Sequence, residues 1–173
     1  MAITQAVANS FKTEVLTAVH NFTASTGDTF KIALFTNSAT LSKATTAYST
    51  SNEVSGTGYT AGGNSLTSVT PVLSTDTAVC DFADSSWTTA TITARGALIY
   101  NSSESDKAVV VLDFGGDKTS TAGTFTIQFP AANLRIAFDA SAAGNCMVNV
   151  PAVDVLSPPK SSTTTALSDS LEL

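Results

Sequence analysis

Charged residues are scarce in this sequence, and basic residues are the scarcest. Its 173 residues include 8 Lys or Arg against 14 Asp or Glu, which gives a formal net charge of −6. A nucleic-acid-binding protein needs clustered basic side chains to neutralise phosphates, so the composition argues against that class. The sequence also has no run of about 18 apolar residues, so no transmembrane helix is expected. The opening residues MAITQ carry no charged segment before an apolar core, which argues against a secretory signal peptide.

Cysteine and histidine are equally rare. The sequence has two cysteines, Cys80 and Cys146, and one histidine, His20. Disulfide-stabilised domains are denser in cysteine, so we interpret both residues as buried free thiols. A zinc site needs about four clustered ligands, and CxxC and HxxxH spacings are absent, so neither a metal nor another cofactor is expected. No GxSxG motif accompanies His20, and we interpret it as a histidine near the end of a helix, where it is favourable against the helix dipole.

Small residues are abundant instead. The sequence has 28 Thr and 22 Ser, which carry hydroxyl groups, and 25 Ala. Threonine favours strands over helices, so this composition predicts a mainly β fold rather than a helical bundle. The length corresponds to one domain with a core of its own. Regular short strands after a single N-terminal helix predict an antiparallel β-sandwich or jelly-roll-like domain.

The first segment carries the one clear helical pattern. Its apolar residues recur at spacings of three, four and one, as on one face of a helix: Ile3, Val7, Phe11, Val15, Leu16 and Val19. The pattern predicts an amphipathic helix over about residues 3–21, ended by the TASTG run. A lone amphipathic helix is unstable in water, so we expect Phe11, Leu16 and Val19 to be buried against the sheet or a neighbouring subunit.

From Thr29 onward the apolar period changes to two, which is typical of strands. The predicted strands are bounded by Ser, Asp, Gly or Asn clusters: Phe30–Phe35, Leu66–Leu73, Thr77–Phe82, Thr91–Tyr100, Ala108–Phe114, Thr124–Phe129 and Arg135–Phe138. Hairpin loops are predicted at Asn101–Asp106 and at Gly115–Gly123, because both are rich in turn-forming residues.

The acidic residues offer no pair whose spacing indicates catalysis. Asp81, Asp84 and Asp113 are candidate calcium ligands together with backbone oxygens, but no DxDxDG-type loop occurs and no metal site is predicted. Trp87 is interpreted as a core aromatic rather than a platform for a sugar. Arg95 and Arg135 stand in otherwise neutral strand segments. Each is expected to pair with an aspartate of a neighbouring strand or to contact a partner subunit.

The end of the chain differs in composition from the rest. Residues 138–173 are predicted to form a C-terminal extension to a single β-rich domain of residues 1–137. Pro158 and Pro159 exclude helix and ladder there. The apolar residues beyond them that we expect to contact another polypeptide are Leu167, Leu171 and Leu173.

Three stretches together carry a family resemblance: MAITQAVANSFKTEVL, then TSNEVSGTGYTAGGNSLTSVTPVLS, then TTATITARGALIYNSSESDKAVVVLDFGGDKTSTAGTFTIQFP. Over roughly residues 1–137 the chain resembles a family of small virion structural proteins of tailed double-stranded DNA bacteriophages, common in aquatic phages. The resemblance implies a protein without enzymatic activity that assembles into the particle. It leaves open whether the protein decorates the capsid or belongs to the tail or neck.

Two function classes follow. The first is a virion structural protein, with a capsid decoration (cement) protein favoured over a tail, neck or fibre component. The second is a carbohydrate- or receptor-binding β-sandwich, which should show several exposed loop aromatics, where this chain has mainly Tyr48 and Tyr59. The expected partners are other virion proteins, the major capsid protein first, and copies of the chain itself in a homo-oligomer, with a trimer favoured. The expected location is the virion, after synthesis in the host cytoplasm.

Overall fold

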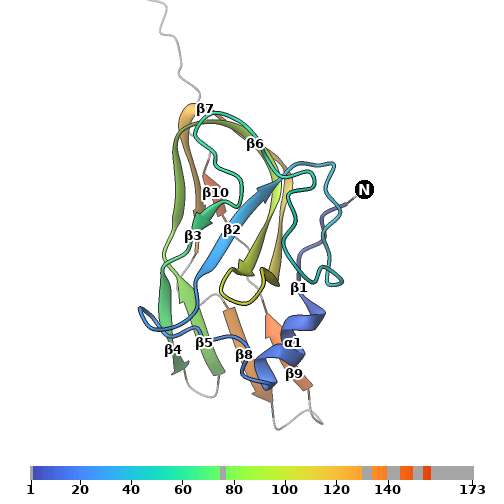
Figure 1. The fold of residues 1–173 in the computed structure, drawn as a ribbon, viewed down its shortest axis with the longest axis vertical. Coiled ribbons are helices and arrows are strands. Elements are labelled where there is room, and N and C mark those ends of the chain that lie inside the picture. The colour runs from blue at the N-terminus through green and yellow to red at the C-terminus, as the bar shows by residue number, and fades with distance from the viewer. Residues whose placement is uncertain (1, 75–76, 130–133, 140–144, 150–153, 157–173) are drawn as a thin grey trace, which may run out of the picture.

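The computed structural model describes residues 2–74, 77–129, 134–139, 145–149 and 154–156, with side chains up to Phe129. The described chain is mainly β, with antiparallel sheets and one short helix (Figure 1). This confirms the predicted β class and its antiparallel character. The helix α1, Asn9–Leu16, lies beside the turn that joins the two longest strands.

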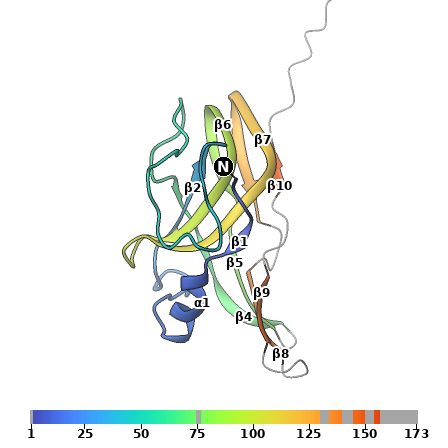
Figure 2. The ribbon, with the colours of Figure 1, turned by 90° about the vertical axis from the view of Figure 1, so that its right-hand side faces the viewer.

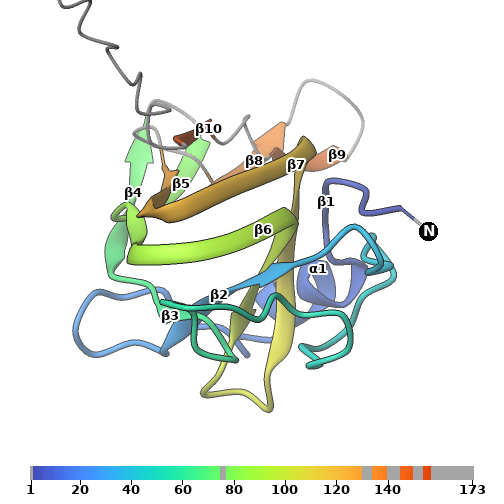
Figure 3. The same cartoon turned by 90° about the horizontal axis from the view of Figure 1, so that it is seen from above.

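The larger sheet has six strands and is built around two long ones. These are β6 (Ser85–Asn101) and β7 (Lys107–Gln128), which run antiparallel over most of their length (Figure 3). The order is β1-β7-β6-β2-β3, with β10 pairing β7 near its end. The shorter members are β1 (Ala6–Val7), β2 (Phe30–Phe35), β3 (Asn64–Ser65) and β10 (Asp154–Leu156).

The second sheet has four strands in the order β4-β5-β8-β9. They are β4 (Ser68–Ser74), β5 (Thr77–Phe82), β8 (Leu134–Asp139) and β9 (Asn145–Asn149). Strand β8 confirms the strand predicted at 135–138. Strands β9 and β10 extend both sheets past residue 137, the predicted domain boundary. Leu167, Leu171 and Leu173 lie outside the described residues.

One apolar core connects the sheets. Phe30 of β2 meets Phe82 of β5 with ring centroids 5.7 Å apart, and Trp87 of β6 packs edge-on against Phe125 of β7 at 6.1 Å. Trp87 and Cys80 are both buried, as predicted. Cys80 is a free thiol, and burial raises its pKa to about 12, so the thiol form dominates at neutral pH.

The helix is much shorter than the predicted 3–21, because sheet and loop pairing occupy the residues before it. Ile3 forms a parallel bridge with Leu41, and Val7 pairs with Val110 of β7. The chain turns into the helix only after Ala8, whose backbone is extended. The periodic apolar residues Ile3 and Val7 are therefore buried, but from extended chain.

The helix ends early as well. Ala18 has φ of +57°, a left-handed conformation that stops the helix two residues after Leu16. Phe11 is fully buried, as predicted, and Val19 is half-buried. Leu16 is 72% exposed, so it does not pack against the sheet, and its burial against a neighbouring subunit stays a prediction. His20 lies beyond the end of the helix, so its predicted role against the helix dipole does not apply.

The two predicted hairpin loops have different outcomes. Residues 101–106 form the turn between β6 and β7, as predicted. Residues 115–123 are not a loop but the middle of β7, where Lys118 pairs with Ala94 and Thr119 with Thr93. Strand β6 pairs with this segment from Lys118 onward, where threonines favour strand structure, and the register shifts at the two glycines before it.

Candidate functional site

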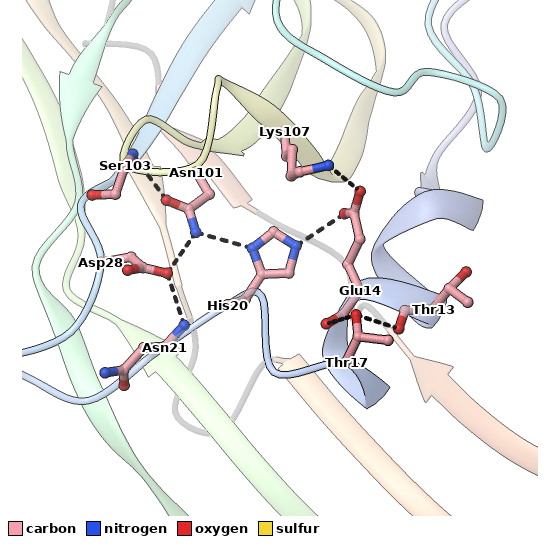
Figure 4. Close-up of polar contacts among 9 residues, drawn as sticks. All are labelled: Thr13, Glu14, Thr17, His20, Asn21, Asp28, Asn101, Ser103 and Lys107. Carbon is pink, nitrogen blue, oxygen red and sulfur yellow. Dashed lines mark hydrogen bonds and ion pairs between the residues drawn. The ribbon is translucent and has the colours of Figure 1, made fainter.

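A chain of polar side chains, with His20 and Asn101 buried at its centre, connects the helix to the β6–β7 turn (Figure 4). It begins at Glu14 on α1, whose Oε1 accepts a hydrogen bond from Lys107 Nζ at 2.8 Å. Its other oxygen, Oε2, lies 3.0 Å from His20 Nε2. Burial alone raises the pKa of Glu14, but the hydrogen bonds from Lys107 and His20 and the lysine charge outweigh it. The pKa of Glu14 therefore lies below its ordinary value of 4.5.

His20 is the centre of this polar chain. Its side chain is completely buried, and the ring lies 5.0 Å from that of Phe11 and 6.4 Å from those of Phe22 and Phe30. The ring nitrogen Nδ1 is 3.0 Å from Asn101 Nδ2. Both nitrogens are therefore engaged, one by the helix and one by the β6–β7 turn.

The polar chain continues from Asn101 to the segment before β2. Asn101 Nδ2 donates to Asp28 Oδ2 at 2.7 Å, and Asn101 Oδ1 accepts from the Ser103 amide at 3.0 Å. Asp28 Oδ2 also accepts from the Asn21 amide at 2.8 Å. The polar chain thus joins α1 and the connection 17–29 that follows it to the β6–β7 turn, which is far from both in sequence.

This arrangement fixes the His20 ring through both of its nitrogens, but it is not set up for nucleophilic catalysis. A serine-type mechanism needs a hydroxyl or thiol on one imidazole nitrogen. Here Glu14 and Asn101 face the two nitrogens of His20, while the Thr17 hydroxyl donates to the backbone carbonyls of Thr13 and Glu14. The sequence offered one signal for this site, a lone histidine, but not its partner Asn101, which is 81 residues away.

A second polar cluster closes the loop between β2 and β3. Glu53 accepts short hydrogen bonds from the hydroxyls of Tyr48 and Tyr59, both 2.6 Å, and one of 2.7 Å from the Gly62 amide. Tyr100 stacks on Tyr48 and donates to the Gly62 carbonyl at 2.8 Å. Burial raises the pKa of all three tyrosines, and the Glu53 carboxylate raises it further for Tyr48 and Tyr59. For Tyr100 the carboxylates of Asp106 and Glu53 add to burial, and its pKa is about 12. The hydroxyl groups of Tyr48 and Tyr59 are therefore used in hydrogen bonds within the fold, which does not favour a role in sugar binding.

The candidate interface arginines have different surroundings. Arg95 pairs with Asp113 of the neighbouring strand β7, with 3.3 Å between nitrogen and oxygen. This is the first of its two predicted roles, pairing with an aspartate of a neighbouring strand. Arg135 stands in β8 opposite Val79 of β5, and its side chain lies outside the described residues. Both partners of the Arg95 pair are partly exposed, so the pair contributes little to stability.

The candidate calcium ligands do not meet. Asp84 accepts from the Phe129 amide at 2.9 Å, Asp81 from the amide of Phe82, and Asp113 from that of Gly115. Within the described residues, no group of three His, Cys, Asp or Glu side chains is placed to hold a metal ion. Each aspartate instead accepts from a backbone amide, and Asp113 also pairs with Arg95.

An open cavity of about 510 Å³ lies beside the loop that follows β2. Most of its lining residues are Thr, Ser and Ala from the segment 39–51, the others are Phe35, Leu41 and Asn52, and no charged residue lines it. No helix among the described residues is long and apolar enough to span a membrane.

Comparison of the chain with protein-family models, curated proteins and solved structures found no match.

Proposed function

We propose that this chain is a non-enzymatic structural protein of a tailed-bacteriophage virion, and that it decorates the capsid as a cement subunit. The resemblance in sequence motivates the class. The observation that carries the capsid-binding part is an uncharged hydroxyl face on the β6–β7 pair. Every exposed residue of β6 between 86 and 93 is Ser or Thr: Ser86, Thr88, Thr89, Thr91 and Thr93.

The neighbouring strand completes this hydroxyl face with Thr119, Thr121 and Thr124, all exposed. Hydroxyls of the two strands bond to each other, Thr93 to Thr119 at 2.9 Å and Ser86 to Thr126 at 2.8 Å. Preordered hydroxyls lose little side-chain entropy on binding and carry no charge to desolvate. Such a face suits a neutral protein surface, and its binding should depend only weakly on salt.

Apolar surface is also exposed at the edge of the smaller sheet. Val69, Val72 and Leu73 of β4 are about half to three-quarters exposed. An edge strand with apolar side chains needs cover from another chain to avoid uncontrolled pairing. In this proposal the protein is a homo-oligomer, with a trimer favoured over a dimer, and the two sheets form a jelly-roll-like sandwich.

The deciding experiment locates the protein on the particle. Antibody labelling of virions should decorate heads, and virions lacking the protein should assemble but break at a lower temperature, because a cement protein binds only the assembled shell. Labelled tails, or loss of adsorption with heads equally robust, would establish the tail or neck alternative instead. Binding to free glycans with intact virion assembly would favour a receptor-binding module.

The hydroxyl face can be tested by introducing charge. Thr88→Lys and Thr121→Lys should each lower occupancy of purified protein on stripped particles at least tenfold, since each places an unpaired charge in a neutral interface. Thr13→Lys on exposed α1 is the matched control and should bind as wild type. Equal occupancy for all three variants would assign the contact to another surface.

A further inference from the structure

We propose that His20 is the proton-sensitive centre of a latch, formed by α1 and residues 17–29, that holds closed at neutral pH and releases under acid. The starting point is the orientation of the Asn101 amide. Its oxygen accepts from the Ser103 amide and its nitrogen donates to Asp28. Turning the amide over would set its oxygen against the Asp28 carboxylate and its N–H groups against the Ser103 N–H, so this orientation is fixed.

The fixed amide decides which nitrogen of His20 carries the proton. An amide NH₂ has no acceptor, so Nδ1 of His20 must accept from Asn101 and be unprotonated. The single ring proton then lies on Nε2, where it donates to Glu14 Oε2. In the closed latch His20 is therefore the neutral Nε2–H tautomer.

A second proton on His20 would break this arrangement. It would set the Nδ1–H against the Asn101 N–H at a separation of 3.0 Å, and neither group has room to turn. Asn101 is held by Asp28 and Ser103, and the imidazole is enclosed by the rings of Phe11, Phe22 and Phe30. The conflict is relieved only when the segment carrying His20 moves away from the β6–β7 turn.

The charged groups around His20 do not remove the conflict. Glu14 faces Nε2 from α1 but already accepts from Lys107 of β7, and it lies on the side of the ring away from Nδ1. Asp28, on the connection to β2, accepts from Asn101 and the Asn21 amide rather than from His20. The faces of the ring meet phenylalanines from α1, the 17–29 connection and β2.

Release of the latch would expose aromatic surface. Phe22 of the 17–29 connection covers Phe30 and Phe82, with ring centroids at 4.2 and 6.3 Å. Phe11 of α1 lies edge-on against Phe22 at 6.0 Å. Lifting α1 and the connection would uncover Phe30 and Phe82 while leaving the β6–β7 pair intact. The latch thus couples protonation of one side chain to exposure of one apolar patch, whatever assembly the protein joins.

The chain makes the test unusually direct because His20 is its one histidine. Histidine is the side chain whose ordinary titration falls between pH 5 and 8. Native-state hydrogen exchange of the full chain should show opening of residues 17–29 increasing as the pH falls through this range, by up to tenfold per pH unit, the limit for uptake of one proton, after correction for intrinsic rates. The amides of β2 and β6 should show no such increase.

Two variants separate the histidine from its neighbours. His20→Asn keeps an acceptor toward Asn101 but does not titrate, so opening should lose its pH dependence over this range. Glu14→Gln removes the carboxylate and keeps His20, so the pH dependence should persist. Acid opening that survives in His20→Asn, or disappears in Glu14→Gln, would overturn the proposal.

A second measurement on the wild-type protein covers the case in which His20→Asn does not fold. Long-range ¹⁵N–¹H spectra of the imidazole should show the neutral Nε2–H tautomer at pH 7.5. The doubly protonated ring should appear only as residues 17–29 lose protection. A protonated ring in a chain whose 17–29 amides stay protected would overturn the latch, and so would the Nδ1–H tautomer at neutral pH.

Discussion

Phe22 stacks on Phe30 with ring centroids 4.2 Å apart and an interplanar angle of 10°. The first residue belongs to the connection after α1 and the second begins β2, so the stack joins the N-terminal segment to the larger sheet. Phe82 of β5 contacts both rings, with its ring centroid 6.3 Å from that of Phe22 and 5.7 Å from that of Phe30, and so connects the second sheet to this stack. This small aromatic group is where the helix, the two sheets and the polar chain around His20 come together.

Phe11 should be the most costly side chain of the helix to remove. It is fully buried against Phe22 and His20, so Phe11→Ala should lower the free energy of unfolding by about 3–5 kcal/mol through lost burial and a cavity. Leu16→Ala on the same helix is the control and should change stability by no more than about 0.5 kcal/mol, since Leu16 is exposed. Urea unfolding of both variants checks this, and equal losses would contradict the packing described.

Two glycines with the same backbone conformation should respond differently to alanine. Gly63 has φ of +68°, and a Cβ there would overlap the backbone carbonyl of Ile32. Gly115 has φ of +71°, but a Cβ there meets nothing within 4 Å. Gly115→Ala should cost about 1–2 kcal/mol for the left-handed conformation alone, and Gly63→Ala should cost at least twice as much because the backbone must shift. Thermal unfolding gives the comparison, and similar melting temperatures would contradict it.

The tyrosine cluster should make the protein resist alkali and then unfold steeply. Burial raises the pKa of Tyr48, Tyr59 and Tyr100 above the ordinary value of 10.0. The folded state thus favours the neutral phenols, so their contribution is complete below about pH 10 and is lost as pH rises through their higher folded values. Near-ultraviolet absorbance should show little tyrosinate before unfolding begins. Gradual ionisation of the three tyrosines in the folded protein would contradict the cluster.

Glu53→Gln tests the carboxylate at the centre of that cluster. The amide oxygen can still accept hydrogen bonds, but it carries no charge to oppose tyrosinate formation. The variant should therefore ionise its tyrosines at lower pH than wild type, and it should also unfold more readily at neutral pH by about 1–3 kcal/mol, because charge-assisted hydrogen bonds are replaced by neutral ones.

Glu14 should contribute stability that disappears in strong acid. Its folded pKa lies below 4.5, so the contribution is present above about pH 4.5 and is lost as pH falls through the lower folded value. Glu14→Gln should be less stable than wild type by about 1 kcal/mol at pH 7, and the difference should be smaller at pH 4. Urea unfolding at both values checks this. The pH range in which the Glu14 contribution is lost lies below the range in which the His20 latch is expected to open, so the two effects are separable.

Local sequence pattern determined several elements of this protein. Alternating apolar residues identified β2, because one or both faces of a buried strand must be apolar whatever surrounds it. The NSSESD run identified the β6–β7 turn, since its residues favour turns locally. The abundance of Thr with few charged residues indicated the β class. Burial of Phe11, Trp87 and Cys80 followed from their apolar character alone.

Tertiary structure decided what pattern alone could not. Ile3 and Val7 fit a helical period, yet Leu41 and Val110 offered them β partners whose hydrogen bonds outweigh a weak helical preference. Within the segment 115–123 predicted as a loop, residues 118–120 became strand because residues 92–94 of β6 pair with them. His20 acquired its role from Asn101, a contact across 81 residues that exists only when the chain is folded. Periodicity reports which residues are buried, whereas the partner that buries them is set by long-range packing.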